Sequence, residues 1–81
     1  MSVELTSKNG KICEGISNGG WAAIVAHSRA FEQSIPAWNG CHDGQVWTPE
    51  HLKLMADRLE QSVKWIPILR ELAEDGGVQI S

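Results

Sequence analysis

The sequence has few aromatic residues other than tryptophan, few cysteines and no long apolar run. Its 81 residues include one phenylalanine, no tyrosine and two cysteines. Two isolated cysteines form no disulfide framework, so we expect Cys13 and Cys41 to be reduced thiols in a cytoplasmic protein. No apolar stretch approaches the roughly 20 residues that cross a bilayer, and residues 1–5 lack the features of a signal peptide. We therefore expect no membrane partner.

Charge of either sign is also sparse. Seven Lys and Arg residues stand against ten Asp and Glu residues, which gives a net charge of −3. No segment is basic enough to bind nucleic-acid phosphates, and the acidic residues are too dispersed to mimic DNA. We expect no nucleic-acid partner, and a chain of this length has room for one small domain, residues 1–81.

Patterns that would support catalysis or metal binding are weak. Residues 41–43, Cys-His-Asp, lack the paired ligand spacing of a zinc site. Gly19-Gly20 belongs to neither a dinucleotide-binding nor a Walker motif, which favours a helix-capping role. We expect no cofactor, no metal and no enzymatic activity. The alternative is a cysteine-dependent hydrolase, with Cys41 as nucleophile and His27 or His51 as base.

What the sequence does contain begins with a predicted β-hairpin over residues 3–16. Asn9-Gly10 favours a type I′ turn, in which both central residues have positive φ. That loop sets the cross-strand register and gives the hairpin one apolar face. The expected pairs are Val3 with Ile16, Leu5 with Glu14, and Ser7 with Ile12, and the apolar face consists of Val3, Leu5, Ile12 and Ile16.

An amphipathic helix is predicted next, with Ser17 or Asn18 as its N-cap and its end near Gln33. Its apolar stripe is Trp21, Ile24, Val25, Ser28 and Phe31, and its other side carries Ala22, Ala23, Ala26 and Ala30. The alanines reflect either helix propensity or a smooth surface for the close approach of another element. Residues 34–47 are expected to be irregular and anchored by Trp38 and Trp47.

Thr48-Pro49 predicts the start of a second helix, with Thr48 as the cap. Its apolar stripe is Leu52, Met55, Ala56, Leu59, Val63 and Ile66. Pro67 is expected to kink or break this helix, and a last helical piece over residues 68–74 ends at Gly76. Residues 78–80 predict a strand that pairs with the hairpin. The sequence therefore predicts an α+β fold, a small antiparallel sheet covered by helices on one face.

The side of the second helix opposite its apolar stripe is the predicted partner-binding surface. Tryptophan and arginine are enriched at the residues that dominate binding energy in protein interfaces. The predicted contacts are Leu54, Arg58, Gln61 and Trp65, together with Trp38 in the irregular segment. The alternative is that the first helix packs against this side and buries it.

Two short motifs resemble those of a diffuse group of small phage and bacterial proteins without an established activity. Asn18-Gly19-Gly20-Trp21 matches an Asn-Gly-x-Trp helix start, and residues 44–48 match a Gly-Gln-x-x-Thr entry into a second helix. The resemblance spans residues 16–63 and assigns no site residues. It implies a phage or mobile-element origin, and small phage proteins often bind host factors, including CRISPR and other defence components.

We therefore expect a non-enzymatic binding protein, with a phage-encoded inhibitor of a host or defence protein as the specific hypothesis. A homodimer is a further possibility. The alternative from another class is a sponge for a nucleotide messenger, with a base stacked on Trp38 or Trp47 and a phosphate held at Gly19-Gly20.

Overall fold

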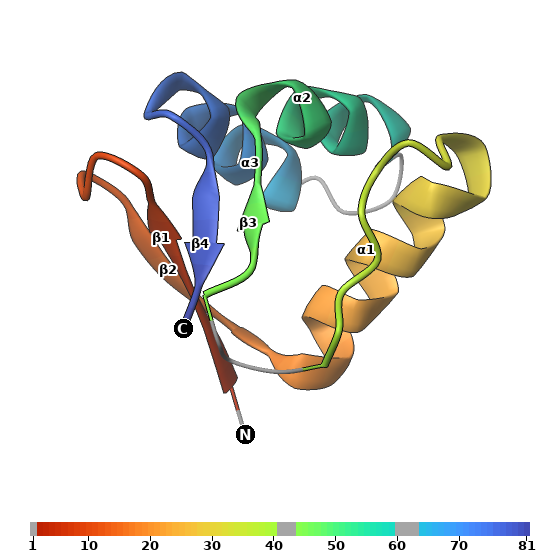
Figure 1. Ribbon diagram of the computed structural model, residues 1–81, viewed down its shortest axis with the longest axis horizontal. Helices are drawn as coiled ribbons and strands as arrows, with labels where there is room; N and C mark the ends of the chain where they lie inside the picture. Colours follow the sequence, from red (N-terminus) through yellow and green to blue (C-terminus); the bar gives the residue numbers. More distant parts are fainter. Residues whose placement is uncertain (1, 41–43, 60–63) are drawn as a thin grey trace.

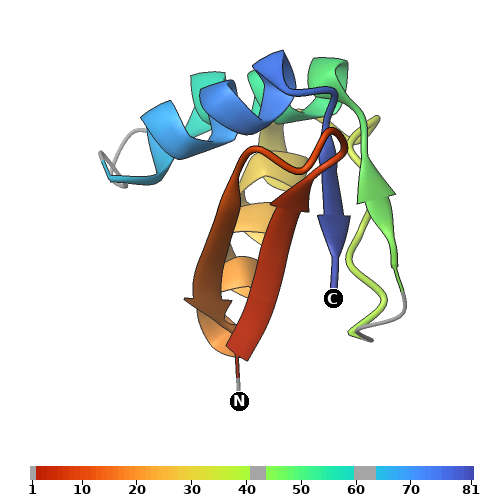
Figure 2. The same ribbon diagram turned by 90° about the vertical axis from the view of Figure 1, so that its left-hand side faces the viewer.

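The computed structural model describes residues 2–40, 44–59 and 64–81. In these residues three helices pack on a four-stranded antiparallel sheet, which confirms the predicted α+β class (Figures 1 and 2). The elements are β1 (Ser2–Ser7), β2 (Cys13–Ser17), α1 (Asn18–Phe31), β3 (Val46–Trp47), α2 (Pro49–Arg58), α3 (Trp65–Glu74) and β4 (Val78–Ile80). Figure 2 shows α1 behind the sheet, and α2 and α3 across its upper end.

β1 and β2 pair in the register that the sequence predicts. Val3 lies opposite Ile16, and Leu5 lies opposite Glu14. Since paired residues share a face and successive residues alternate, Val3, Leu5 and Ile16 all point towards the helices and are buried.

The turn between these strands differs from the predicted one. A type I′ turn needs positive φ at both central residues, but only Gly10 has one, at 82°. The Gly10 N–H donates to the Ser7 carbonyl over 2.9 Å, and the Ser7 N–H donates to the Ile12 carbonyl over 2.8 Å. The loop therefore comprises residues 8–11, and the type I′ prediction is wrong. The register is unchanged because this longer loop has the same centre.

β4 lies between β1 and β3, in a sheet whose strand order is β2-β1-β4-β3. Its pairing with β1 confirms the predicted C-terminal strand. β3 was not predicted, because residues 34–47 were expected to be irregular throughout. Val46 lies opposite Gln79 and Trp47 lies opposite Val78. A two-residue strand has no periodicity of its own and depends on its distant partner.

α1 begins at Ser17, one of the two predicted caps, whose Oγ accepts a hydrogen bond from the Gly20 N–H over 3.0 Å. Four residues of the predicted stripe are buried, namely Trp21, Ile24, Val25 and Ser28. Phe31 is the exception and is 59% exposed. It belongs to the last turn of α1, which extends away from the sheet (Figure 1). The helix ends there, two residues before the predicted Gln33.

α2 begins as predicted, with Thr48 Oγ1 accepting from the His51 N–H and Pro49 in the first turn. It ends at Arg58, and Ile66 belongs to α3, so the prediction of one helix with a stripe from Leu52 to Ile66 is wrong. Val63, a member of that predicted stripe, lies outside the described residues. α3 starts at Trp65, which places Pro67 in its first turn. The first four N–H groups of a helix lack intrahelical partners, so proline loses nothing there. Inside a continuous helix it would remove a hydrogen bond and crowd a carbonyl.

Gly76 and Gly77 terminate α3 with φ values of 94° and 106°. The Gly76 N–H donates to Ala73 over 3.3 Å, and the Gly77 N–H donates to Leu72 over 2.9 Å, which is the pairing of a Schellman motif. This confirms the predicted glycine cap. A Cβ on Gly77 would lie 2.7 Å from the Trp47 carbonyl oxygen, so this position also requires glycine for the close approach of β3.

Two fully buried tryptophans join the helices, the sheet and the irregular segment. The rings of Trp21 and Trp47 meet edge to face, with centroids 5.2 Å apart. Trp47 Nε1 donates to the Pro36 carbonyl over 3.0 Å. Trp47 therefore anchors residues 34–47, as the sequence predicts, and holds α1 against the sheet.

Candidate functional site

The solvent-facing stripe of α1 consists only of glycine and alanine. Gly19, Ala23, Ala26 and Ala30 follow the spacing i, i+4, i+7 and i+11, and all four are exposed. At about 100° per residue, this stripe lies opposite the buried stripe. We call these four residues the α1 ridge.

α1 also carries almost no charge. Arg29 is its single charged residue. The Arg29 Nε donates to the Ile35 carbonyl over 2.9 Å, which directs the guanidinium towards the returning chain. A surface helix of a globular protein ordinarily has polar and charged residues on its outer side. The α1 ridge departs from that pattern along its whole length.

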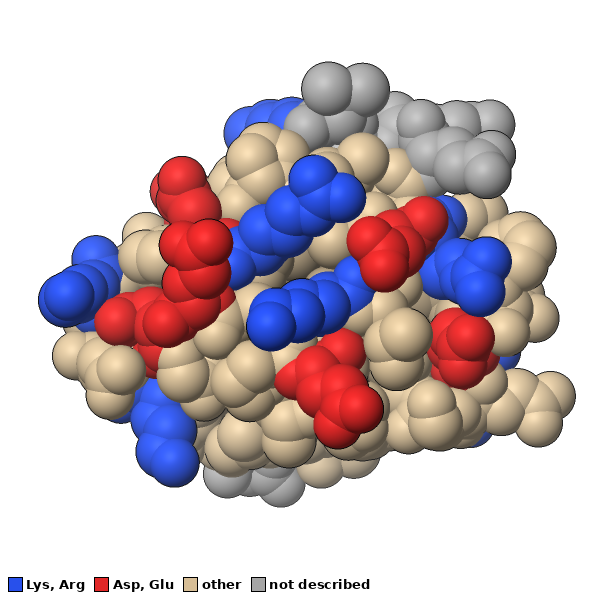
Figure 3. All heavy atoms as spheres, turned by 90° about the horizontal axis from the view of Figure 1, so that it is seen from above, with Lys and Arg blue, Asp and Glu red and all other residues tan. Residues whose placement is uncertain are grey.

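The outer surfaces of α2 and α3 provide the contrast. Figure 3 shows basic and acidic side chains interspersed over them. Arg70 Nη2 lies 3.6 Å from Asp57 Oδ1, and the hollow around this pair is also lined by Lys53 and Glu74. Such a surface is well solvated, since both signs of charge are mixed. The uncharged surface is therefore confined to one helix of the three.

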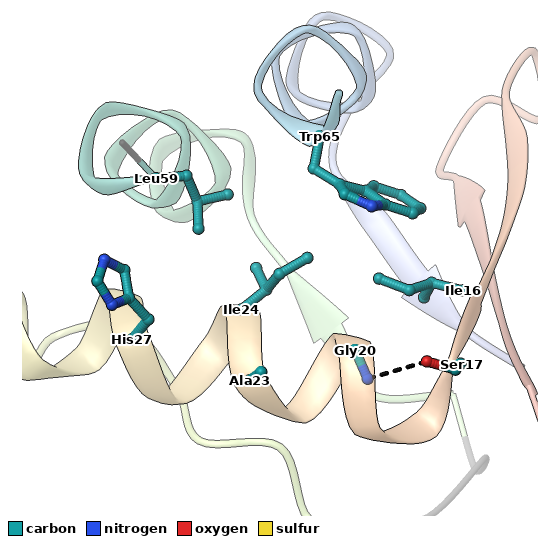
Figure 4. A pocket seen from close by; sticks show the side chains of 8 residues that line it. All are labelled: Ile16, Ser17, Gly20, Ala23, Ile24, His27, Leu59 and Trp65. Atoms are coloured by element: carbon teal, nitrogen blue, oxygen red, sulfur yellow. Dashed lines mark hydrogen bonds between the residues drawn. The ribbon is translucent and has the colours of Figure 1, made fainter. Parts of the chain in front are cut away.

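A groove with a volume of about 400 Å³ runs along one side of the α1 ridge. In Figure 4 the half-buried Trp65 side chain extends from α3 towards Ile16, while Leu59 and His27 close the other end. The groove is mostly apolar, and we call it the Trp65 groove. Its lining includes Ile16, Gly20, Ile24, His27, Leu59 and Trp65.

A smaller hollow of about 150 Å³ lies on the other side of the ridge. Its far wall is Trp38, half-buried and packed partly against the core. We call it the Trp38 groove, and its lining is Ala22, Val25, Ala26, Arg29, Ala37 and Trp38. The α1 ridge therefore has a tryptophan-walled groove on each flank.

The C-terminal end of α1 presents an exposed aromatic side chain. The Arg58 guanidinium carbon lies 5.8 Å from the centroid of the Phe31 ring, and Arg58 Nη2 lies 3.3 Å from Glu32 Oε1. The His27 ring lies edge to face with Phe31, at 5.4 Å between centroids, and His27 Nε2 donates to the Arg58 carbonyl over 3.1 Å. These contacts hold Phe31 in place on the surface.

The predicted partner-binding residues do not form one helical face. Arg58 ends α2 and Trp65 begins α3, so the face predicted for a single long helix does not exist. Leu54 is half-buried against the core, whereas the Arg58 side chain is 45% exposed. Gln61 lies outside the described residues. Arg58 and Trp65 nevertheless both border the outer side of α1, one near each end of the Trp65 groove.

Sequence reasoning missed the central element of this surface. The alanines of α1 were visible as one side of a helix, but either propensity or packing explained them. Phe31 was assigned to the core. The available signal was the absence of charge opposite the apolar stripe, which is unusual for an exposed helix.

The structure also places residues that the sequence analysis named for nucleotide binding. Trp47 is fully buried, so its ring does not present a face for stacking on a nucleotide base. The N–H of Gly20 at the start of α1 is already bonded to Ser17.

Cys41, the proposed nucleophile of the hydrolase alternative, lies outside the described residues. Across the described ranges, no three His, Cys, Asp or Glu side chains are grouped to hold a metal ion, and no helix is long and apolar enough to cross a membrane.

No protein-family model, curated protein or solved structure matches this chain. The resemblance to small phage and bacterial proteins therefore stays a prediction from the two motifs.

Proposed function

We propose that this protein is a non-enzymatic binding protein that docks on a partner protein through the α1 ridge and its two flanking grooves. The observation that carries the proposal is the stripe of exposed glycine and alanine that runs for about three turns along α1, in a molecule whose other helices have charged outer surfaces. The partner is a protein because the surface is long, shallow and apolar.

The small side chains support docking because they let another backbone approach closely. Helices pack at interaxial distances of about 8–10 Å, and the short end of that range requires small residues at the contact. The missing charges support it as well, since burying an unpaired charge in an interface costs binding free energy. The α1 ridge can be covered without that cost.

The two grooves supply the anchoring positions. Trp65 and Trp38 are half-buried, so each side chain is held by the fold and still offers surface to a partner. Tryptophan is enriched among the residues that contribute most to binding because it buries a large area with little loss of side-chain freedom. Arg58, beside Phe31, adds a charged contact at the rim.

We further propose that the partner belongs to a host cell and that the protein is a phage-encoded inhibitor, with a CRISPR-type or other defence protein as the target. The support for this narrower identity is the resemblance at Asn18–Trp21 and at residues 44–48. The α1 surface supports binding to a protein partner but does not identify that partner.

The experiment is affinity capture from bacterial lysate with the tagged wild-type chain and three variants. Ala26→Glu puts a charge on the α1 ridge, Trp65→Ala removes an anchor, and Gln79→Glu is the control on the outer face of the sheet. A partner captured by the wild type and the control, but lost with both other variants, supports the proposal. A partner retained by Ala26→Glu and Trp65→Ala would show that another surface binds it.

A further inference from the structure

We propose that the outer edge of β2 and the adjoining Trp65 groove bind one extended segment of the partner protein, which joins the sheet as a strand antiparallel to β2. This inference rests on the proposed function, because the Trp65 groove is part of the proposed docking face. It adds the conformation and the residue pattern of the segment that binds there. The free backbone groups of β2, the regularity of its edge, the position of the groove and the charge of β2 support it.

The first feature is a set of backbone groups on β2 that point away from the sheet. Glu4 lies opposite Gly15, but it exchanges both of its backbone hydrogen bonds with Ser81, over 3.0 Å. The backbone of Gly15 is therefore not bonded to β1, and neither is that of Cys13, since bonded pairs alternate along an antiparallel ladder. Both residues are exposed and turn an N–H and a carbonyl outwards. An added strand offers donors and acceptors at the same two-residue spacing.

The second feature is the regularity of this edge. Proteins ordinarily keep sheet edges from pairing by shortening the strand, by a bulge, a proline or a lysine, or by covering it. β2 pairs with β1 over five consecutive residues without a bulge, and its sequence Cys-Glu-Gly-Ile-Ser contains neither proline nor lysine. Among the described strands, none pairs with its outer side (Figure 2). The opposite edge is protected, because β3 has only two residues.

The third feature is the position of the Trp65 groove beside this edge. In Figure 4, β2 forms one wall of the groove, and Ile16 points from β2 towards Trp65. In an added strand, the residue opposite Ile16 has its side chain on the same face of the sheet as Ile16. That side chain therefore points towards the groove, whose volume of about 400 Å³ accommodates a large apolar side chain.

The fourth feature is the charge of β2, which extends the pattern. Glu14 is the one charged residue of this strand, and it is exposed on the same face of the sheet as Ile16. The Lys64 ammonium belongs to the α3 side, where it lies 5.8 Å from the centroid of the Trp65 ring. A lysine or arginine of the partner opposite Glu14 forms a favourable cross-strand pair. Because an antiparallel strand runs in the reverse direction, the segment reads apolar-x-basic from its N-terminus.

Peptide selection followed by backbone methylation tests the proposal. A display library of random short peptides, selected on the purified full chain, should be enriched in the apolar-x-basic pattern. Methylation of one backbone nitrogen at a time then removes a donor from a selected synthetic peptide without changing its side chains. Its affinity, measured by fluorescence anisotropy, should fall by about tenfold at the positions opposite Cys13 and Gly15 and change little at the positions between them.

Two substitutions at one position of β2 give a matched comparison. Gly15→Pro removes the outward N–H and leaves the bonds to β1 intact, since proline is tolerated where an edge N–H faces solvent. Gly15→Ala keeps the N–H and places its Cβ in open space. Gly15→Pro should abolish binding of the selected peptide, and Gly15→Ala should leave it unchanged. Unfolding curves check that both variants are folded.

Amide hydrogen exchange of the wild-type chain gives a readout that needs no variant. The selected peptide should slow exchange at the N–H groups of Cys13 and Gly15, which face outwards. The N–H of Ile16 is already bonded to β1, so its exchange should change much less. Selection on Glu14→Lys should replace the basic residue of the pattern with an acidic one.

The outcomes separate this inference from the proposed function. Strand addition is overturned if the library yields no binding peptide, if methylation shows no alternation, or if binding survives in folded Gly15→Pro. A cellular partner lost with Ala26→Glu but retained by Gly15→Pro leaves the proposed function standing without strand addition. A peptide that adds to β2, in a chain whose captured partners do not depend on α1, supports the inference and contradicts the proposed function.

Discussion

The Ser7 hydroxyl donates a hydrogen bond to the carboxylate of Asp75, 68 residues further along the chain. The same carboxylate oxygen accepts from the Lys11 backbone N–H over 3.0 Å, and the Asp75 carbonyl accepts from the Asn9 N–H over 3.2 Å. The loop between β1 and β2 is thereby joined to the end of α3. The Ser7 hydrogen bond, followed by the Lys11 N–H, lowers the pKa of Asp75 below its ordinary value of 3.8.

A pH dependence of stability follows from that lowered pKa. A carboxylate whose folded pKa lies below its unfolded pKa stabilises the fold fully above the unfolded value, about 3.9, and loses this contribution as pH falls through the folded value. We expect Asp75→Asn to be less stable than wild type near neutral pH, with the difference shrinking in acid. Urea unfolding near pH 7 and near pH 2.5 measures it. Glu74→Gln, at an exposed neighbour, is the control, and a pH-independent difference for Asp75→Asn would contradict the assignment.

The two glycine conformations allow strain to be separated from steric contact. Gly10 has a φ of 82° and open space around the position that a Cβ would occupy, whereas at Gly77 the Cβ would lie 2.7 Å from the Trp47 carbonyl oxygen. Gly10→Ala should destabilise by about 1–2 kcal/mol from backbone strain alone. Gly77→Ala should cost more, because β3 must also move. Equal losses in thermal unfolding would mean that the close approach of β3 has no energetic weight.

Trp47 is expected to be essential for the fold. Trp47→Ala should cost about 3–5 kcal/mol, a large part of the roughly 4–12 kcal/mol total expected at this chain length. Trp47→Phe keeps most of the apolar volume but loses the hydrogen bond to Pro36, which should cost about 1–3 kcal/mol. Denaturant unfolding measures both, and a Phe variant as unstable as the Ala variant would assign the whole effect to the hydrogen bond.

Trp65, in contrast to Trp47, is expected to contribute to partner binding and not to be essential for the fold. Trp65→Ala should weaken binding of a captured partner by about 2 kcal/mol, roughly 30-fold, while the chain stays folded. Calorimetric titration of the purified partner gives the affinity, and the far-ultraviolet circular dichroism spectrum reports the fold. If the variant unfolds, Trp65 is a core residue and the binding role fails.

Local signals in the sequence predicted most of the fold. Asn9-Gly10 correctly centred the hairpin and its register, although not its turn type. The Ser17 and Thr48 caps and the glycine at position 76 act through neighbouring backbone groups, so their effects are visible without the tertiary structure. The break between α2 and α3 was misplaced for a different reason. Periodicity continued through it, and only the cost of Pro67 inside a helix argued against continuation.

The sequence predicted which residue types form the candidate site, but it did not predict how these residues are arranged around α1. Trp65, Arg58 and Trp38 were selected because their chemistry suits interfaces, and all three border α1. Their relation to the α1 ridge depends on how the helices pack, which periodicity within one helix does not specify. β3 was missed on the same ground, since Val46 and Trp47 become a strand only through β4.

β4 occupies an inner position in the sheet although it follows the other three strands in the sequence. Its neighbours are β1 and β3, and beyond it Ser81 exchanges backbone hydrogen bonds of 3.0 Å with Glu4 in both directions. While residues 78–81 are still inside the ribosomal exit tunnel, the hairpin and β3 have no strand to connect them. Folding of the nascent chain therefore waits for these residues to emerge, and proteolytic removal of them would separate β3 from the rest of the sheet.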